Sequence, residues 1–171
     1  QIPSSVLDLV NARVADLDDD ERNLLDVASC CGFEFDPILV AQAVGLAPVP
    51  AMQRLARIEK RHRLVRSSGR RFLFDHHQVR EALYGAIPEP LREAYHASIA
   101  TSLETQHAAA TSDPKSVDGA LAVDLAEHLL KGAQGERALR YLDAAASHLR
   151  RGHLNAQVIA LIERALAAPK L

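Results

Sequence analysis

The sequence predicts a mainly α-helical protein with one β-hairpin in its first half. Ala, Leu and Arg dominate the 171 residues, whereas aromatic residues make up only 4%, and such a composition favours helices. Apolar residues recur at helical spacing along most of the chain. In "RLVRSSGRRFLF", by contrast, two short apolar runs flank Ser68-Gly69 and predict strands at 63–67 and 71–75, joined by a tight turn.

Three helices are expected before residue 46. The first begins at Ser4 or Ser5. The acidic run 18–21 opens the second, because negative charge is stabilising near a helix N-terminus. A third, residues 37–44, follows Asp36-Pro37, a pair that caps and opens helices. The apolar face of the second helix consists of Leu24, Leu25, Val27, Ala28 and Cys31, and Phe33 and Phe35 are expected to anchor the core behind it.

The fourth helix, residues 50–62, has one apolar and one basic side. Met52, Leu55 and Ala56 share a face, which we expect to be buried. The basic side continues into the hairpin through six arginines: Arg54, Arg57, Arg61, Arg66, Arg70 and Arg71. Such a stripe fits phosphate contacts by a DNA-binding helix and wing, and it also fits docking on an acidic protein surface. Both interpretations stay open.

After the hairpin, a helix begins near His76 and a longer one covers 90–107, with a predicted stripe of Leu91, Tyr95, Ile99 and Leu103. The small, polar stretch 108–118 is typical of a linker. We therefore expect two domains, residues 1–107 and 119–171. Three helices are predicted in the second domain, near 119–132, 136–151 and 154–168.

These patterns predict two kinds of module. Helices that end in one β-hairpin are typical of a winged-helix domain, and paired helices of similar length are typical of the start of a helical repeat. In the last helix, Val158, Leu161, Ile162 and Ala165 line one side, and Ile159 and Leu166 lie on another. A surface this broadly apolar is expected to be covered on two sides, so pairing of two copies stays open.

Three stretches of the chain share residues with a known arrangement. In the first they are Pro3, Ser4, Ala12, Arg13, Arg22, Leu24, Leu25, Ala28, Gly32 and Phe35. In the second they are Phe72, Phe74, His76, Val79, Arg80, Glu81, Tyr84, Arg92, His96, Ile99, Ala100, Leu103 and Glu104. The third is "DLAEHLLKGAQGERALRYLDAAASHLRRGHLNAQVIALIERAL". Together they resemble the segment that follows the nucleotide-binding core in STAND-class, AAA-related signalling ATPases.

That resemblance implies a winged-helix domain followed by the first tetratricopeptide-like repeats of a sensor arm. It implies a non-catalytic segment of a bacterial signalling or transcriptional regulator that binds ATP or ADP elsewhere. The expected partners are the nucleotide-binding core of the same protein and a protein recognised by the arm, with nucleic acid as the alternative. The chain starts at Gln1 and ends within a helical pattern, so we expect a piece of a longer protein.

The resemblance also assigns a role to His76, which matches a histidine that approaches the β-phosphate of bound ADP in relatives. Here Asp75 replaces the usual arginine before it, and His77 replaces a small residue or aspartate after it. Read without the family, the His76-His77 pair has a simpler interpretation, in which His76 fills the corner between strand and helix and His77 faces water.

Other chemistry finds little support in the sequence. No phosphate loop of the form G-x-x-x-x-G-K-[S/T], HExxH motif or nucleophile elbow occurs, so neither an enzyme nor a cofactor of this segment is expected. The histidines lack the spacing of a zinc site, and no metal is expected. Cys30 and Cys31 are adjacent, which excludes a CxxC pair and favours a reducing, cytoplasmic setting. No apolar run is long enough for a membrane span.

Overall fold

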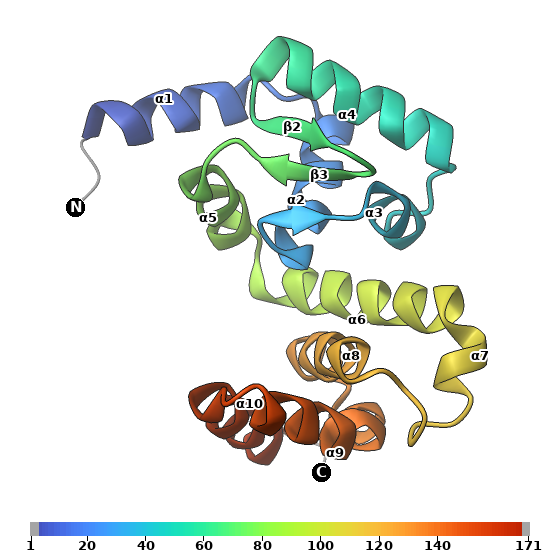
Figure 1. Ribbon diagram of the computed structural model, residues 1–171. Helices are drawn as coiled ribbons and strands as arrows, with labels where there is room; N and C mark the ends of the chain where they lie inside the picture. The colour runs from blue at the N-terminus through green and yellow to red at the C-terminus, as the bar shows by residue number, and fades with distance from the viewer. Residues whose placement is uncertain (1–3, 169–171) are drawn as a thin grey trace. The chain divides into compact units, whose positions relative to one another are not determined.

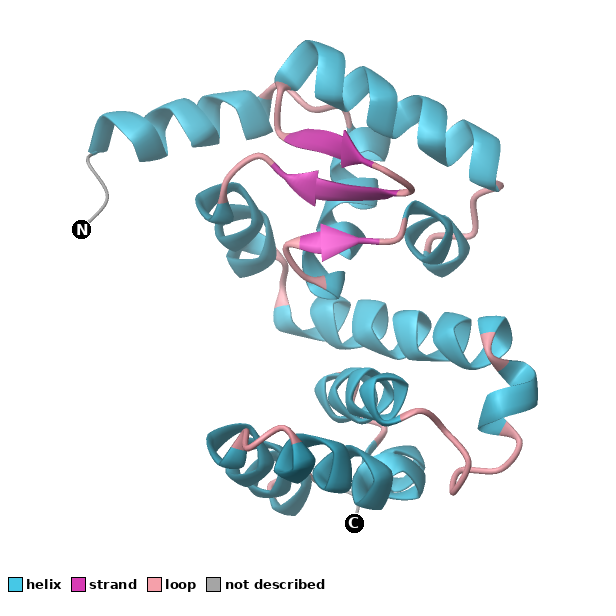
Figure 2. Ribbon diagram, viewed as in Figure 1, coloured by secondary structure: helices cyan, strands magenta, loops and turns pink. Residues whose placement is uncertain are grey.

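The computed structural model describes residues 4–168, with side chains from Val6 onward, and the described chain is 73% helical with a small antiparallel sheet (Figures 1 and 2). It divides into two compact units between Arg92 and Glu93. The predicted mainly α fold is therefore confirmed. Pro3, which belongs to the first matching stretch, lies outside the described residues.

The first unit contains all three described strands and the helices α1 to α5. They are α1 (Ser4–Ala15), α2 (Asp19–Cys31), β1 (Glu34–Phe35), α3 (Pro37–Ala43), α4 (Pro48–His62), β2 (Val65–Ser68), β3 (Arg71–Phe74) and α5 (His77–Ala86). The acidic opening of α2 is a capping box: the Asp18 carboxylate accepts the Glu21 N–H, and the Glu21 carboxylate accepts the Asp18 N–H. Asp36 caps α3 as predicted.

The sheet has three strands in the order β1-β3-β2, all antiparallel. The predicted hairpin is present, but Ser68 pairs with Arg71, so the turn consists of Gly69 and Arg70 instead of Ser68 and Gly69. Gly69 has φ +60°, which the first position of a type II′ turn requires. Strand β1 was not predicted, because two residues are too short to show an alternating pattern.

The core of the first unit is formed by α2, α4, α5 and the inner side of the sheet. Leu25, Leu55 and Phe74 are completely buried, and the Phe35 and Phe74 rings lie 5.4 Å apart. Three predicted core positions need correction: Cys30 is buried in place of Cys31, and Ala51 and Ile58 flank Leu55 in place of Met52 and Ala56, which are exposed. Phe35 is buried as expected, whereas Phe33 is only half-buried.

The second unit is helical throughout its described residues. Its elements are α6 (Glu89–Gln106, which begins in the first unit), α7 (Ala108–Thr111), α8 (Gly119–Lys131), α9 (Gly135–Arg151) and α10 (Asn155–Leu166). The predicted linker thus contains the short helix α7, and Val117 within it is buried. In α6, Ile99 and Leu103 are buried as predicted, but Leu91 is exposed, and His96 and Ala100 complete the buried face.

Two turns in this unit repeat the same backbone conformation. Gly132 ends α8 and Gly152 ends α9, and each is followed by a residue with positive φ, Ala133 at +55° and His153 at +57°. The turns differ in their surroundings. A Cβ added to Gly132 would lie 2.6 Å from the Ala97 backbone nitrogen, whereas one added to Gly152 would meet only ordinary contacts at 3.6 Å.

One face of the last helix lacks cover within the described chain. Val158, Leu161 and Ala165 are buried, while Ile159, Ile162 and Leu166 are exposed. Ile162 was expected on the buried side, and it lies instead with Ile159 and Leu166 at helical spacing. No single described helix is long and apolar enough to cross a membrane, and α3 and α4 meet that criterion only as a pair bent by 114°.

Candidate functional site

The predicted histidine pair lies where β3 ends and α5 begins. His76 occupies the N-cap position with extended backbone, φ −148° and ψ 148°, and its side chain makes no capping hydrogen bond. Its imidazole is exposed. The His77 ring stacks on Phe33 at a centroid distance of 4.1 Å. Both imidazoles are exposed, so His77 faces water as expected without the family, although its ring also stacks on Phe33. The expectation that His76 fills the corner is wrong, because its side chain faces water as well.

The six predicted arginines divide into two groups. Arg54 lies 3.7 Å from the Asp20 carboxylate, and Arg71 lies 3.0 Å from Glu34 on the neighbouring strand. Arg57, Arg61, Arg66 and Arg70 are exposed, and no ion pair to them is found among the described residues. Four of the six predicted arginines are therefore available to a partner.

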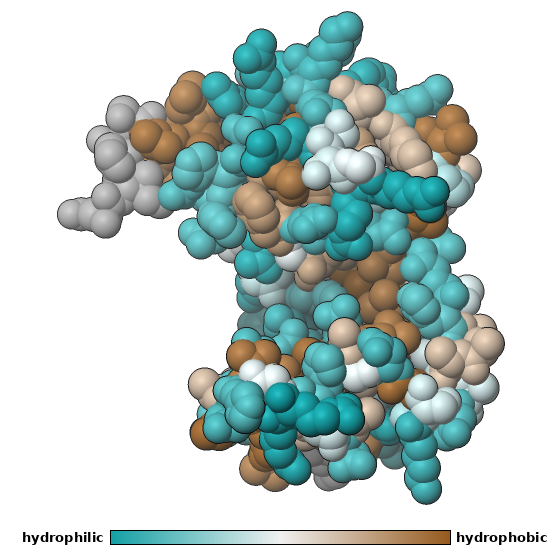
Figure 3. All heavy atoms as spheres, viewed as in Figure 1, coloured by the Kyte–Doolittle hydropathy of each residue, from teal (hydrophilic) through white to brown (hydrophobic). Residues whose placement is uncertain are grey.

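The exposed side of α4 carries apolar residues between its cations. Val49 is 64% exposed and Met52 36% exposed, and both lie at helical spacing with Ala56 and Arg57. We call Val49, Met52, Gln53, Ala56, Arg57, Lys60 and Arg61 the α4 outer face. Figure 3 shows this mixture over α4, with apolar residues near the start of the helix. A shallow hollow lined by Gln53, Ala56 and Arg57 lies on it.

Polar contacts behind the outer face hold α4 in place. The His62 Nε2 atom lies 3.3 Å from a carboxylate oxygen of Glu21, which is buried at the start of α2. The Glu59 carboxylate accepts the Ser67 N–H at 2.9 Å and so ties the helix to β2. The first contact therefore joins α4 to α2, and the second joins α4 to the hairpin.

A second set of polar residues in the first unit has a structural role that the sequence did not reveal. The Arg80 Nε–H donates to the Ser29 carbonyl at 2.9 Å. The Tyr84 ring lies between two guanidinium groups, 4.9 Å from Arg80 and 5.0 Å from Arg92. Arg80, Tyr84 and Arg92 all belong to the second matching stretch. Their place in that stretch was the only sequence signal that could have indicated this role.

The second matching stretch also supplies one partner, His96 or Glu104, to each of three polar contacts inside the second unit. The Nδ1 atoms of His96 and His128 lie 2.9 Å apart. The Glu104 carboxylate accepts hydrogen bonds from Arg137 at 2.6 Å and from the Tyr141 hydroxyl at 3.0 Å. Burial and the Glu104 charge raise the pKa of Tyr141. These residues therefore join α6 to α8 and α9.

The environment of the buried cysteine Cys30 makes its thiol unreactive. Burial, together with the charge of Asp26, raises the pKa of the Cys30 thiol to about 12, so it stays protonated and is a weak nucleophile at neutral pH. Within residues 4–168, no group of three or more His, Cys, Asp or Glu side chains is arranged to hold a metal ion.

Comparison of the chain with protein-family models, with characterised proteins and with solved structures finds no match. The geometry of the first unit is therefore the basis for a functional interpretation. This unit offers an α4 outer face that combines exposed arginines with exposed apolar side chains, and it has an exposed imidazole at the start of α5.

Proposed function

We propose that this chain is a non-catalytic regulatory segment of a multidomain, cytoplasmic STAND-type ATPase. In this proposal residues 1–107 form a winged-helix domain, and residues 119–171 begin a tetratricopeptide-like arm. The element order α2-β1-α3-α4-β2-β3 with sheet order β1-β3-β2 supports the first assignment. The repeated glycine turns after α8 and α9 support the second. ATP or ADP is bound by the core of the parent protein.

The observation that carries the proposal is the composition of the α4 outer face. Binding to DNA phosphates is strengthened by positive charge. Binding to a protein surface is also strengthened when apolar side chains are buried in the interface. Val49 and Met52 are exposed beside Arg57, and Gln53 is the only amide side chain on this face. The mixture favours docking on an acidic, partly apolar protein surface, for which we propose the nucleotide-binding core. His76, exposed at the N-cap of α5, would approach the nucleotide there.

A second candidate function is DNA binding through Arg57, Arg61, Arg66 and Arg70. The observation that favours it is that these four arginines are exposed and have no ion-pair partner within the described chain. Placing α4 in the major groove and the hairpin over phosphates would use all four.

Titration of the chain with labelled duplex DNA at several salt concentrations separates the two candidates. The docking proposal predicts only weak binding at physiological salt, with a Kd of about 100 µM or weaker, which is the weak end of the range for non-specific binding. Micromolar binding with a steep salt dependence, lost in Arg57→Ala/Arg61→Ala and retained in Arg150→Ala, would establish DNA binding instead. Arg150 is the matched control because it is exposed and unpaired in the described chain but lies in the second unit.

A further inference from the structure

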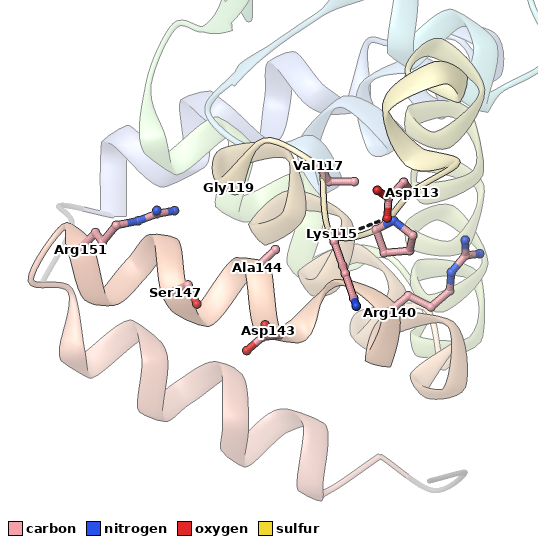
Figure 4. A pocket seen from close by; sticks show the side chains of 10 residues that line it. Asp113, Lys115, Val117, Gly119, Arg140, Asp143, Ala144, Ser147 and Arg151 are labelled. Carbon is pink, nitrogen blue, oxygen red and sulfur yellow. Dashed lines mark hydrogen bonds between the residues drawn. The ribbon is translucent and has the colours of Figure 1, made fainter.

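The second unit carries an open pocket of about 610 Å³ between the 113–119 loop and one side of α9 (Figure 4). This volume is in the usual range of ligand-binding sites. Val117 and Ala144 give the pocket an apolar floor, and Lys115 reaches toward α9 from the loop. The pocket lies wholly within one unit.

The α9 side of the pocket is a continuous stripe along the helix. Its residues are Arg140, Asp143, Ala144, Ser147 and Arg151, which recur at the spacing of one helix face. Because an α-helix rises 1.5 Å per residue, the backbones of Arg140 and Arg151 lie about 16 Å apart. The site is therefore long, and its length suits an extended ligand.

Charge along the stripe alternates. Lys115 and Arg140 supply positive charge toward one end and Arg151 at the other, with Asp143 and Ser147 between them (Figure 4). Among the described residues none of these charged side chains has an ion-pair partner. The remaining carboxylate, Asp113, accepts the Lys115 N–H at 3.1 Å and shapes the loop. A complementary ligand is negative at both ends and offers a donor in the middle.

We propose that this pocket binds an extended peptide segment with two acidic side chains four residues apart. Extended chain rises about 3.3 Å per residue and alternates its side chains. Residues i and i+4 then lie about 13 Å apart on the same side, within reach of Arg140 and Arg151 because arginine side chains are long. Residue i+2 points the same way, toward Asp143 and Ser147, so a lysine there is complementary.

The proposal names a partner class for the arm. Its biological use rests on the proposed function, whereas the binding itself does not. A peptide of sequence Gly-Gly-Glu-Ser-Lys-Ser-Glu-amide, with fluorescein on its N-terminal amine, is titrated with the whole chain and followed by anisotropy. We expect saturable binding below 1 mM, weakened at least tenfold when both glutamates become glutamine. Arg140→Gln/Arg151→Gln is expected to weaken binding at least tenfold, and Arg150→Gln, adjacent but outside the pocket, less than twofold.

A charge swap tests the register directly. Arg151→Glu is expected to weaken binding of the original peptide at least fivefold. A peptide with lysine in place of the glutamate that faces residue 151 is expected to bind this variant within threefold of the original pair. Circular dichroism checks that each variant is folded, which is expected since Arg140 and Arg151 are exposed.

Several outcomes would overturn the inference. The first is the absence of saturable peptide binding up to 1 mM. The second is equal affinity for the peptide with glutamine in place of both glutamates. The third is an unchanged peptide affinity of Arg140→Gln/Arg151→Gln. Displacement of the peptide by millimolar phosphate or citrate, with the same arginine dependence, would instead identify a small-anion site. Arg57→Ala/Arg61→Ala is expected to leave peptide affinity unchanged, so failure of the docking role in the first unit is measured separately.

Discussion

Replacing Gly132 with alanine is expected to destabilise the second unit by about 3 kcal/mol. The added Cβ would lie 2.6 Å from the Ala97 nitrogen and 2.9 Å from its Cα. These are backbone atoms of α6, so no side chain can rotate away and the two helices must separate. Separation also strains the His96–His128 and Glu104–Arg137 contacts that join α6 to α8 and α9. Urea denaturation followed by circular dichroism measures the loss.

Gly152→Ala is the matched control for this prediction. Gly152 occupies the equivalent turn position with nearly the same backbone, φ −82° against −88° for Gly132, but a Cβ there meets its neighbours only at 3.6 Å. The unfolding free energy of this variant is expected to stay within about 0.5 kcal/mol of that of the unsubstituted chain, or to rise slightly because alanine restricts the unfolded state. Equal effects of the two substitutions would contradict the close approach of Gly132 and Ala97.

Acidification from pH 7 to pH 5 is expected to destabilise the second unit through the His96–His128 pair. Only one proton fits between two Nδ1 atoms 2.9 Å apart, so the two rings cannot both be charged while this contact is kept. Burial, with a contribution from the Lys131 charge, lowers the pKa of His128 from 6.5 to about 4. Between pH 4 and pH 6.5 the unfolded chain binds more protons than the folded chain. The contribution of neutral His128 to the unfolding free energy is therefore complete above pH 6.5 and is lost as the pH falls toward 4. At pH 5 the loss is about 2 kcal/mol.

His128→Gln tests the origin of this pH dependence, because it removes the titrating group and keeps a side chain that can hydrogen-bond. Its unfolding free energy is expected to be lower at pH 7 but to change less between pH 7 and pH 5. His153→Gln, at an exposed turn position, is expected to keep the full pH dependence. A parent chain equally stable at both pH values would show that His128 titrates normally in the folded state.

Much of the fold could be predicted because its signals are local. Ser68-Gly69 between two short apolar runs marked the hairpin, the acidic run 18–21 marked the start of α2, and Asp36-Pro37 marked α3. Strand β1 could not be predicted, because its two residues form a strand only by pairing with β3, which is distant in the sequence. Adjacent Cys30 and Cys31 fit the helical pattern almost equally, and only the packing of α2 decides which one is buried.

The candidate site was predictable in its residue types but not in its pairing. The six arginines look alike in sequence, and the contacts of Arg54 with Asp20 and of Arg71 with Glu34 join residues more than thirty positions apart. The same holds for His96 with His128. The pocket beside α9 was missed because its loop, 113–119, has the composition of a linker, although Val117 within it is buried.

The proposed docking of the α4 outer face on a nucleotide-binding core is tested by ADP release from the proposed STAND-type protein that contains this chain. Arg57→Glu/Arg61→Glu is expected to release labelled ADP at least tenfold faster than the unsubstituted protein, because the reversed charges would be repelled by the acidic surface proposed for the core. Arg150→Glu, equally exposed but in the second unit, is expected to match the parent rate. Identical release rates for all three proteins would contradict the docking role.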